Sequence, residues 1–337
     1  KATVSETVGI TDITINYSRP DVNGREGKIW GNVVSYGFNN FSFATNSNTA
    51  PWRAGANGNT TISFENDVTF EGKPVKAGTY GLNMAVWPDS VLIILTNQLD
   101  AWGSFYYEEK NKVLQVIVKP VALDKSVELL KYEFIEQKEK YCVVALQWEK
   151  LSVPFKIEVD VDNIVIARLR EQITNQKGFV SANLVQASQY CFNKNINLEE
   201  GLSWSIRAVN GFMGQKTYIT LRNIAVGYEK LNRIPQADST MAEALTIATA
   251  NQYTAYGKIL IGQKRADKAL EVLLASQKRY GNVYGVNSGL MSGYSAKADY
   301  KKAIAYAEKA MAQAPNDATK KQLEANIVKL KEGKDIN

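Results

Sequence analysis

Six arginine, tryptophan and asparagine side chains in the first third of the chain have the chemistry of a small-ligand site. Arginine forks bind planar carboxylate or phosphate groups, and the face of tryptophan stacks on sugar rings or cations. If these side chains converge in space, they form a shallow pocket for a sugar or a small anion. The predicted ligand-binding residues are Arg19, Arg25, Trp52, Arg53, Asn57 and Trp102.

A structural role would explain the same residues equally well. Arg53 and Asn57 could hold loop backbone in place, while Trp52 and Trp102 close the ends of a folded domain. The neighbouring Gly55 favours this alternative, because glycine marks sharp backbone turns. Both interpretations stay open at the level of sequence.

The chain contains no histidine, and this absence weakens the case for an enzyme. Histidine is the commonest general acid or base and the commonest metal ligand, and it completes the Ser-His and Cys-His nucleophile pairs. We therefore assign no catalytic residue, metal ligand or cofactor. The alternative function is a carboxylate-dependent hydrolase acting on glycans, for which Asp100, Glu108 and Glu109 lie near aromatic residues. The only two cysteines, Cys142 and Cys191, are expected to be buried free thiols, although a disulfide between them stays possible.

The elements that position these residues are predicted to be strands. Apolar and polar residues alternate along several short segments, such as 13–17, 61–65 and 155–159. This period of two puts one face of each strand on a core and the other in water, as in antiparallel sheets. Residues 1–160 are therefore predicted to form an antiparallel β-sandwich. The stretch from Tyr36 to Ala56 is irregular, and loops of that length are often functional.

After Asp160 the apolar period becomes helical, so residues 161–337 are predicted to form a second, helical domain. The first helix is expected to start at Asp160 or Asp162 and to end at Gly178. Small residues then recur, with Ala237, Ala269 and Ala303 spaced by 32 and 34 residues.

This recurrence resembles the tetratricopeptide repeat, a helix-turn-helix of about 34 residues. Three clear units, a weaker one near residues 200–209 and a terminal helix over 319–332 predict a short α-helical solenoid. Small residues such as Ala225 and Gly257 would let paired helices approach closely.

The resemblance implies a concave face that binds a protein or peptide partner. Nine residues are expected to point inward, and three of them could clamp an acidic group. The partner-binding residues are Arg222, Asn251 and Lys258, with Val226, Glu229, Thr254, Ser288, Ser292 and Ser295 beside them. The β half could instead pack into this groove, because residues 1–160 carry a net charge of −3 and residues 161–337 one of +9.

The basic charge of the helical half does not indicate nucleic-acid binding. Its lysines are scattered without interleaved aromatic residues, which is typical of a solvated helical surface. No run of 18 or more apolar residues occurs, so a protein that does not span the membrane is expected.

Several motifs of the first half, read in order, resemble one family. They are Tyr17-Ser18-Arg19-Pro20, Gly24-Arg25, Lys28-Ile29-Trp30-Gly31, Val34-Ser35-Tyr36-Gly37, Trp52-Arg53-Ala54-Gly55-Ala56-Asn57, Lys76-Ala77-Gly78-Thr79-Tyr80 and Leu99-Asp100-Ala101-Trp102-Gly103. Residues 8–155 thus resemble the domain of unknown function 2911, known from exported bacterial proteins. Phe38 to Pro51 are interposed relative to the family pattern and would alter the mouth of any site there.

The resemblance implies export to the periplasm or cell surface and implies no reaction. Together with the repeats it predicts a non-catalytic binding or scaffolding protein of the bacterial envelope. Its β-sandwich would carry a site for a small polar ligand, and its repeats would bind protein partners.

Overall fold

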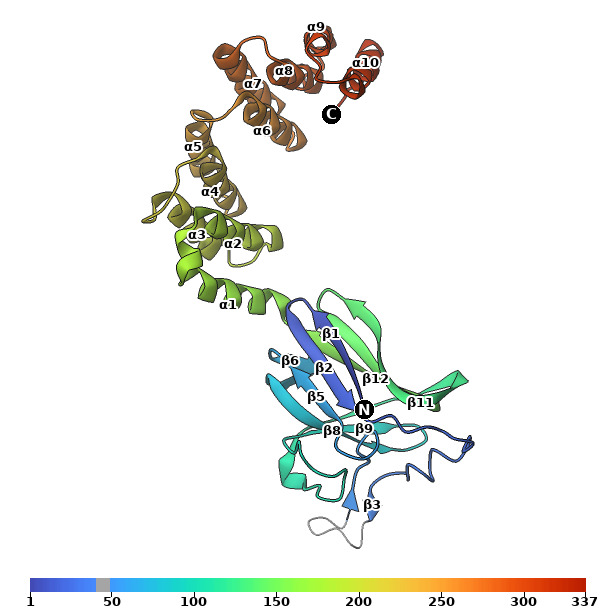
Figure 1. Ribbon diagram of the computed structural model, residues 1–337. Helices are drawn as coiled ribbons and strands as arrows, with labels where there is room; N and C mark the ends of the chain where they lie inside the picture. The colour runs from blue at the N-terminus through green and yellow to red at the C-terminus, as the bar shows by residue number, and fades with distance from the viewer. Residues whose placement is uncertain (41–48) are drawn as a thin grey trace. The chain divides into compact units, whose positions relative to one another are not determined.

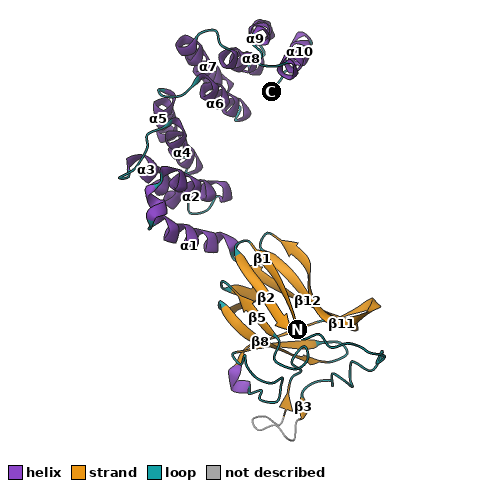
Figure 2. Ribbon diagram, viewed as in Figure 1, coloured by secondary structure: helices purple, strands orange, loops and turns teal. Residues whose placement is uncertain are grey.

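The computed structural model describes residues 1–40 and 49–337. They form two compact units, Lys1–Glu171 and Gln172–Asn337. Strands make up most of the first unit and helices the second (Figure 2). The predicted fold class, an antiparallel β-sandwich followed by a helical solenoid of the tetratricopeptide type, is confirmed.

Antiparallel strands build the β unit (Figure 1). In the described residues they form a six-stranded sheet of order β1-β2-β5-β8-β9-β10, a four-stranded sheet of order β11-β12-β6-β7, and the small pair β3-β4. The strands are β1 (Ala2–Val8), β2 (Thr11–Tyr17), β3 (Asn39–Asn40), β4 (Thr49–Ala50), β5 (Thr61–Phe64), β6 (Val68–Phe70), β7 (Lys73–Val75), β8 (Gly78–Val86), β9 (Val91–Thr96), β10 (Lys112–Val118), β11 (Val121–Lys138) and β12 (Tyr141–Val159).

The two larger sheets share one hydrophobic core, which makes them a sandwich. Ile15 and Leu82 of the first sheet and Trp148 and Phe155 of the second are fully buried in the same cluster. Along β2, buried and exposed residues alternate as the sequence period predicted. The core buries Cys142 as a free thiol, and burial raises its pKa to about 12.

The irregular stretch from Tyr36 to Ala56 carries more structure than its composition suggested. β3 pairs with β4, and the two strands flank residues 41–48. These residues are the centre of the interposed segment from Phe38 to Pro51, and they lie outside the described residues. After β4, Trp52 forms an isolated antiparallel bridge with Met84 of β8.

The first helix, α1 (Val161–Ile173), ends earlier than the sequence suggested. Gly178, the expected end, lies instead in a separate 3₁₀ turn over Gln176–Phe179. Val161, Ile164 and Val165 pack against the core of the sandwich, so the start of α1 belongs to the β unit. Residues 1–160 and 161–337 remain our proposed domains, because the change from strand to helix lies at Asp160.

The remaining helices of the described chain follow one another as antiparallel pairs and a final single helix (Figure 1). The pairs are α2 (Ser181–Lys194) with α3 (Leu198–Asn210), α4 (Tyr218–Lys230) with α5 (Ile234–Leu245), α6 (Ala250–Gly262) with α7 (Ala266–Tyr280) and α8 (Tyr284–Ala296) with α9 (Tyr300–Ala312), followed by α10 (Asp317–Lys331). The predicted weak first unit corresponds to α2 and α3, and the terminal helix to α10.

Small residues allow these helices to pack closely, as the repeat pattern predicted. Ala237, Ala269 and Ala303 are buried on α5, α7 and α9. Leu273 of α7 fits among glycines of the two neighbouring inner helices: a Cβ atom at Gly257 of α6 would lie 2.7 Å from a methyl carbon of Leu273. Gly289 and Gly293 of α8 lie equally close to the same side chain.

Candidate functional site

Arg53, the centre of the predicted ligand site, is bonded to its own loop. Its Nη1 donates a hydrogen bond to the carbonyl oxygen of Asn57 at 2.5 Å. The guanidinium also lies over the ring of Phe105, 5.4 Å from its centroid, and directly against Gly103. Ala54 and Asn57 take positive φ angles of 50° and 61°, so the loop is sharply curved around this side chain. Burial lowers the pKa of Arg53 from its usual value.

Trp52 points from the same loop into the core. Its Nε1 donates to the carbonyl oxygen of Gly55 at 3.0 Å. Its ring stacks on Trp148 at 6.2 Å and meets Trp30 edge-on at 5.8 Å. The contacts of Trp52 are therefore those of a packed residue.

Arg19 and Arg25 form a separate group. Arg19 donates from Nε to the carbonyl oxygen of Leu130 at 2.9 Å. Arg25 donates to the carbonyl oxygens of Val22 and Asp21 at 2.8 and 2.7 Å. Both arginines thus bind main chain around Asp21 and β11, whereas Arg53 and Trp52 bind the loop after β4. The structure divides the predicted set rather than gathering all of it.

Trp102 differs from the other predicted residues because it is 61% exposed. It lines a cleft of about 390 Å³ together with Tyr17, Ser18, Asn59 and Asp100. The Nδ2 of Asn59 donates to the carbonyl oxygen of Gln98 at 3.0 Å, while its Oδ1 is buried without a hydrogen-bond partner among the described residues. The exposed indole of Trp102 is the feature of this cleft that could stack against a sugar ring.

Two of the three carboxylates considered for glycan hydrolysis, Glu108 and Glu109, form ion pairs with lysines, whereas Asp100 lines the cleft beside Trp102. Glu108 contacts Lys110 at 2.8 Å. Glu109 accepts a hydrogen bond from the hydroxyl of Tyr107 at 2.6 Å and contacts Lys112. The bonds from Lys112 and Tyr107 lower the pKa of Glu109, whereas a general acid needs a raised one. Within residues 1–40 and 49–337, no group of three or more acidic or cysteine side chains could hold a metal ion.

A groove lies on the inner helices of the repeat array, α6, α8 and α10. It has a volume of about 710 Å³. Three residues expected on the concave face, Lys258, Ser288 and Ser292, line it. The sequence reasoning missed the other lining residues, which are Ile261, Gly262, Lys264, Tyr284, Met291, Thr319, Gln322, Leu323, Asn326, Asp335, Ile336 and Asn337.

The other two predicted partner-binding residues do not line this groove. Asn251 lies against Gly285, where an added Cβ atom would be 2.5 Å from its Oδ1. Arg222 is half-buried on α4, one repeat unit earlier. Thr254, expected beside them, donates to the carbonyl oxygen of Gly285 at 2.7 Å. A role for Arg222 and Asn251 in binding therefore stays a proposal, separate from the groove.

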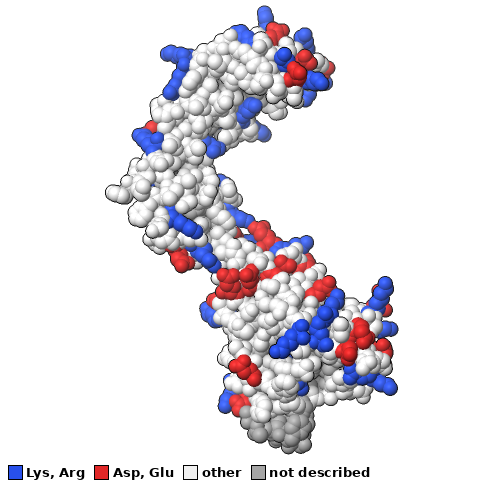
Figure 3. All heavy atoms as spheres, viewed as in Figure 1, with Lys and Arg blue, Asp and Glu red and all other residues white. Residues whose placement is uncertain are grey.

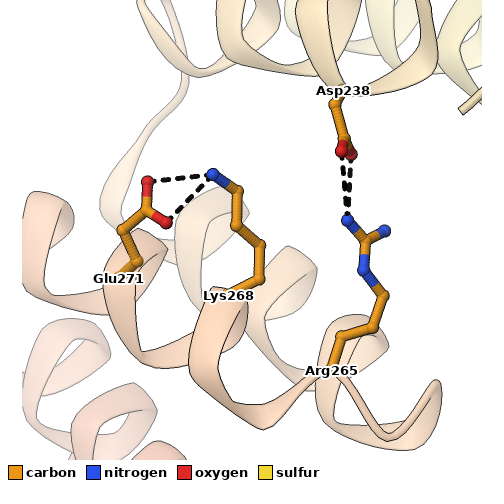
Figure 4. Close-up of polar contacts among 4 residues, drawn as sticks. All are labelled: Asp238, Arg265, Lys268 and Glu271. Atoms are coloured by element: carbon orange, nitrogen blue, oxygen red, sulfur yellow. Dashed lines mark hydrogen bonds and ion pairs between the residues drawn. The ribbon is translucent and has the colours of Figure 1, made fainter. Parts of the chain in front are cut away.

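An ion pair joins neighbouring repeat units near Arg222. Arg265, in the turn before α7, reaches across to Asp238 of α5 with N–O distances of 3.0 and 3.3 Å (Figure 4). Lys268 and Glu271 form a second pair along α7 at 2.9 Å. The Arg265 pair links one unit to the next, whereas the Lys268 pair is a local helix contact worth about 0.3–0.5 kcal/mol.

Glu229 of α4 lies beside this cluster, and its environment leads to a prediction. Burial raises its pKa, and Asp238 acts in the same direction, against Arg265 and Arg222. Because the folded pKa lies above the unfolded one, stability falls as the pH rises from the unfolded pKa through the folded pKa. Glu229→Gln should therefore raise the melting temperature at pH 7 and change it little near pH 4. An equal change at both pH values in thermal unfolding would contradict this origin of the effect.

Basic side chains are spread singly over the visible face of the helical unit, without a continuous patch (Figure 3). This distribution agrees with a solvated surface. In the described part of the chain, no helix is long and apolar enough to cross a membrane.

Solved tetratricopeptide structures are similar to about half of the chain. One is the APC/C hetero-tetramer Cut9-Hcn1, at 15% identity and a TM-score of 0.34, over 51% of this chain and 33% of that chain. Another is YrrB, described as a TPR protein with an unusual peptide-binding site, at 12% identity and a TM-score of 0.30, over 49% and 89%. A third is a tetratricopeptide repeat protein from Parabacteroides merdae ATCC 43184, at 15% identity and a TM-score of 0.33, over 51% and 68%. We draw no functional conclusion from likenesses this low.

No curated protein matches the chain. The family described as "Protein of unknown function (DUF2911)" matches residues 1–157. This match confirms the resemblance that the motifs of the first half indicated. Residues 1–157 are thus similar to that family, and a tetratricopeptide-like array of helices follows them.

Proposed function

We propose that this protein is a non-catalytic binding or scaffolding protein whose helical groove holds an acidic segment of a partner protein. The groove on α6, α8 and α10 carries this proposal, because its volume of about 710 Å³ accommodates several residues of an extended peptide. Lys258 and Lys264 line it with exposed ammonium groups. The rest of the lining combines apolar side chains, such as Met291 and Leu323, with hydroxyl and amide groups and the carboxylate of Asp335. Such a surface favours acidic peptides through charge complementarity.

The proposal is tested by selecting peptides from a random phage-displayed library on the whole chain. We expect the selected peptides to be rich in Asp and Glu, and Lys258→Glu to weaken their binding about tenfold, which corresponds to about 1.4 kcal/mol. Lys278→Glu makes the same charge change on an exposed site of α7 outside the groove, so it should have little effect. Selection of peptides without acidic enrichment, or an equal loss in both variants, would overturn the proposal.

The cleft beside Trp102 is our proposed site for a small polar ligand on the β-sandwich. Its exposed indole, which can stack on a sugar ring, supports a sugar in preference to an anion. The arginines of the predicted site donate to main-chain oxygens, which leaves less of their bonding capacity for an anion.

Export to the bacterial envelope also belongs to this proposal and is supported by the family resemblance of residues 1–157. A hydrolase is the weaker alternative, because Glu108 and Glu109 are paired with lysines. Detection of the native protein in the periplasmic or surface fraction of its host would support the localisation, and detection in the cytoplasm would overturn it.

A further inference from the structure

Residues 335–337 return to the concave face after α10 and line the groove. The turn is made by Gly333, whose φ is +69°, and the main-chain N–H of Lys334 donates to the carbonyl oxygen of Lys329 at 3.0 Å. The next residues, Asp335 to Asn337, line the same groove as Lys258. These three residues therefore form part of the wall of the groove, beside its open volume.

Each of these three residues makes a different kind of contact. The hydroxyl of Ser295 donates to Oδ1 of Asp335 at 2.6 Å, and the main-chain N–H of Ile336 donates to the same hydroxyl oxygen at 3.1 Å. The side chain of Ile336 is half-buried against the apolar cluster of α8, α9 and α10. Nδ2 of Asn337 donates to the carbonyl oxygen of Ser292 at 3.0 Å.

We propose that residues 335–337 are an internal ligand of the groove, which recognises extended peptides of the pattern acid–aliphatic–amide. A partner segment of that chemistry would displace them and repeat their contacts with Ser295, the apolar cluster and Ser292. This inference rests on the proposed peptide-binding function and specifies both the kind of peptide and its competitor.

The alternative is that the segment is a permanent cap on the last repeat. A cap would bury its side chains, yet Asp335 and Asn337 remain exposed and only Ile336 is half-buried. The groove also extends beyond the segment to Lys258 and Lys264 on α6. These features favour a weakly held segment. Burial acts to raise the pKa of Asp335, but hydrogen bonds from Ser295 and Asn337 outweigh this effect and lower the pKa. The contacts of the segment therefore favour the ionised carboxylate of Asp335.

A weak segment can still compete because it is tethered. A short linker gives an effective concentration of roughly 1 mM. If the segment binds with an intrinsic dissociation constant of about 0.1 mM, it reduces the fraction of free groove about tenfold. Releasing it should improve the binding of an added peptide by that factor.

The experiment measures fluorescence anisotropy of a labelled peptide that copies residues 332–337, amidated so that it carries no terminal carboxylate. It compares the whole chain with the double variant Asp335→Ala, Ile336→Ser. We expect about tenfold tighter binding to the double variant. Lys334→Ala removes only an exposed contact with Glu332 and should bind like the unchanged chain. A scrambled peptide with the same residues should bind neither form.

If the labelled peptide binds the unchanged chain and the double variant with equal affinity, residues 335–337 are not an internal ligand. If the scrambled peptide binds as well as the labelled peptide, the proposed pattern is wrong. If the double variant does not fold, the single variant Asp335→Ala removes the contact of the segment with Ser295, leaves the groove itself unchanged, and should likewise improve binding of the labelled peptide. Its failure to do so would overturn the proposal. Failure of the proposed function would give a different result, because acidic peptides from the library would then bind neither the unchanged chain nor its variants.

Discussion

Replacing Trp52 by alanine is expected to lower the free energy of unfolding by about 3 kcal/mol, as for other large aromatic side chains removed from cores. The indole stacks on Trp148, which is fully buried, and meets Trp30 edge-on. Its removal would leave a cavity and would also remove the hydrogen bond from the indole to the carbonyl oxygen of Gly55 within the loop. Chemical denaturation, followed by tryptophan fluorescence and circular dichroism, measures the loss.

Trp102→Ala is the matched control, because the same side chain is removed from a largely exposed position. It should change stability by less than about 0.5 kcal/mol. In thermal-shift assays with glycan fragments, phosphate and sulfate, it should nevertheless remove any shift that a glycan produces in the unchanged protein. If instead Trp102→Ala destabilises the fold as much as Trp52→Ala, the indole of Trp102 is structural and the proposed cleft is wrong.

Leu273→Ala is expected to cost about 3 kcal/mol, within the range for buried leucines. Leu273 is fully buried and fits among glycines of α6 and α8. Its truncation would therefore leave a cavity between neighbouring repeat units. Thermal unfolding and hydrogen exchange of the helical unit would report the loss.

The packing of Leu273 against Gly257 predicts that the effects of substituting these two residues are not additive. Gly257→Ala alone should destabilise, since the new Cβ would lie 2.7 Å from Leu273. Combined with Leu273→Ala it should cost less than the sum of the two, because the added methyl fills part of the cavity. Gly262→Ala on the same helix meets nothing within 4 Å and should be neutral or slightly stabilising. If the destabilisations from Gly257→Ala and Leu273→Ala are strictly additive, Leu273 does not pack against Gly257 as described.

The candidate site was only partly predictable for a reason that concerns hydrogen bonds. The type of a residue shows what Arg53 can bind, but the partner is chosen by local backbone geometry. The carbonyl oxygen of Asn57, a residue with positive φ in a sharply curved loop, accepts from Arg53, and neither the composition nor the spacing of the motif indicates this. Similarly, Trp52 and Trp102 have the same chemistry in sequence, yet one is packed and the other exposed.

The repeat groove shows the same limit. Lys258 and Ser288 could be placed on the concave face from the resemblance to the tetratricopeptide repeat, because the position of a residue within the repeat implies which way it faces. The return of residues 335–337 onto Ser292 and Ser295 involves residues 40 or more positions apart. A short polar segment carries no periodic signal, so its position follows only from the packed surface that receives it.

The sequence by itself therefore determined the class and order of the two halves, because hydrophobic periods of 2 and 3.6 are properties of each element alone. It also indicated the repeat, since small residues at about 34-residue spacing must meet in successive helix pairs. The tertiary structure decided which polar side chains are used up in holding backbone and which face solvent. That choice depends on contacts between distant segments, such as Trp52 on Trp148 and Asp335 on Ser295.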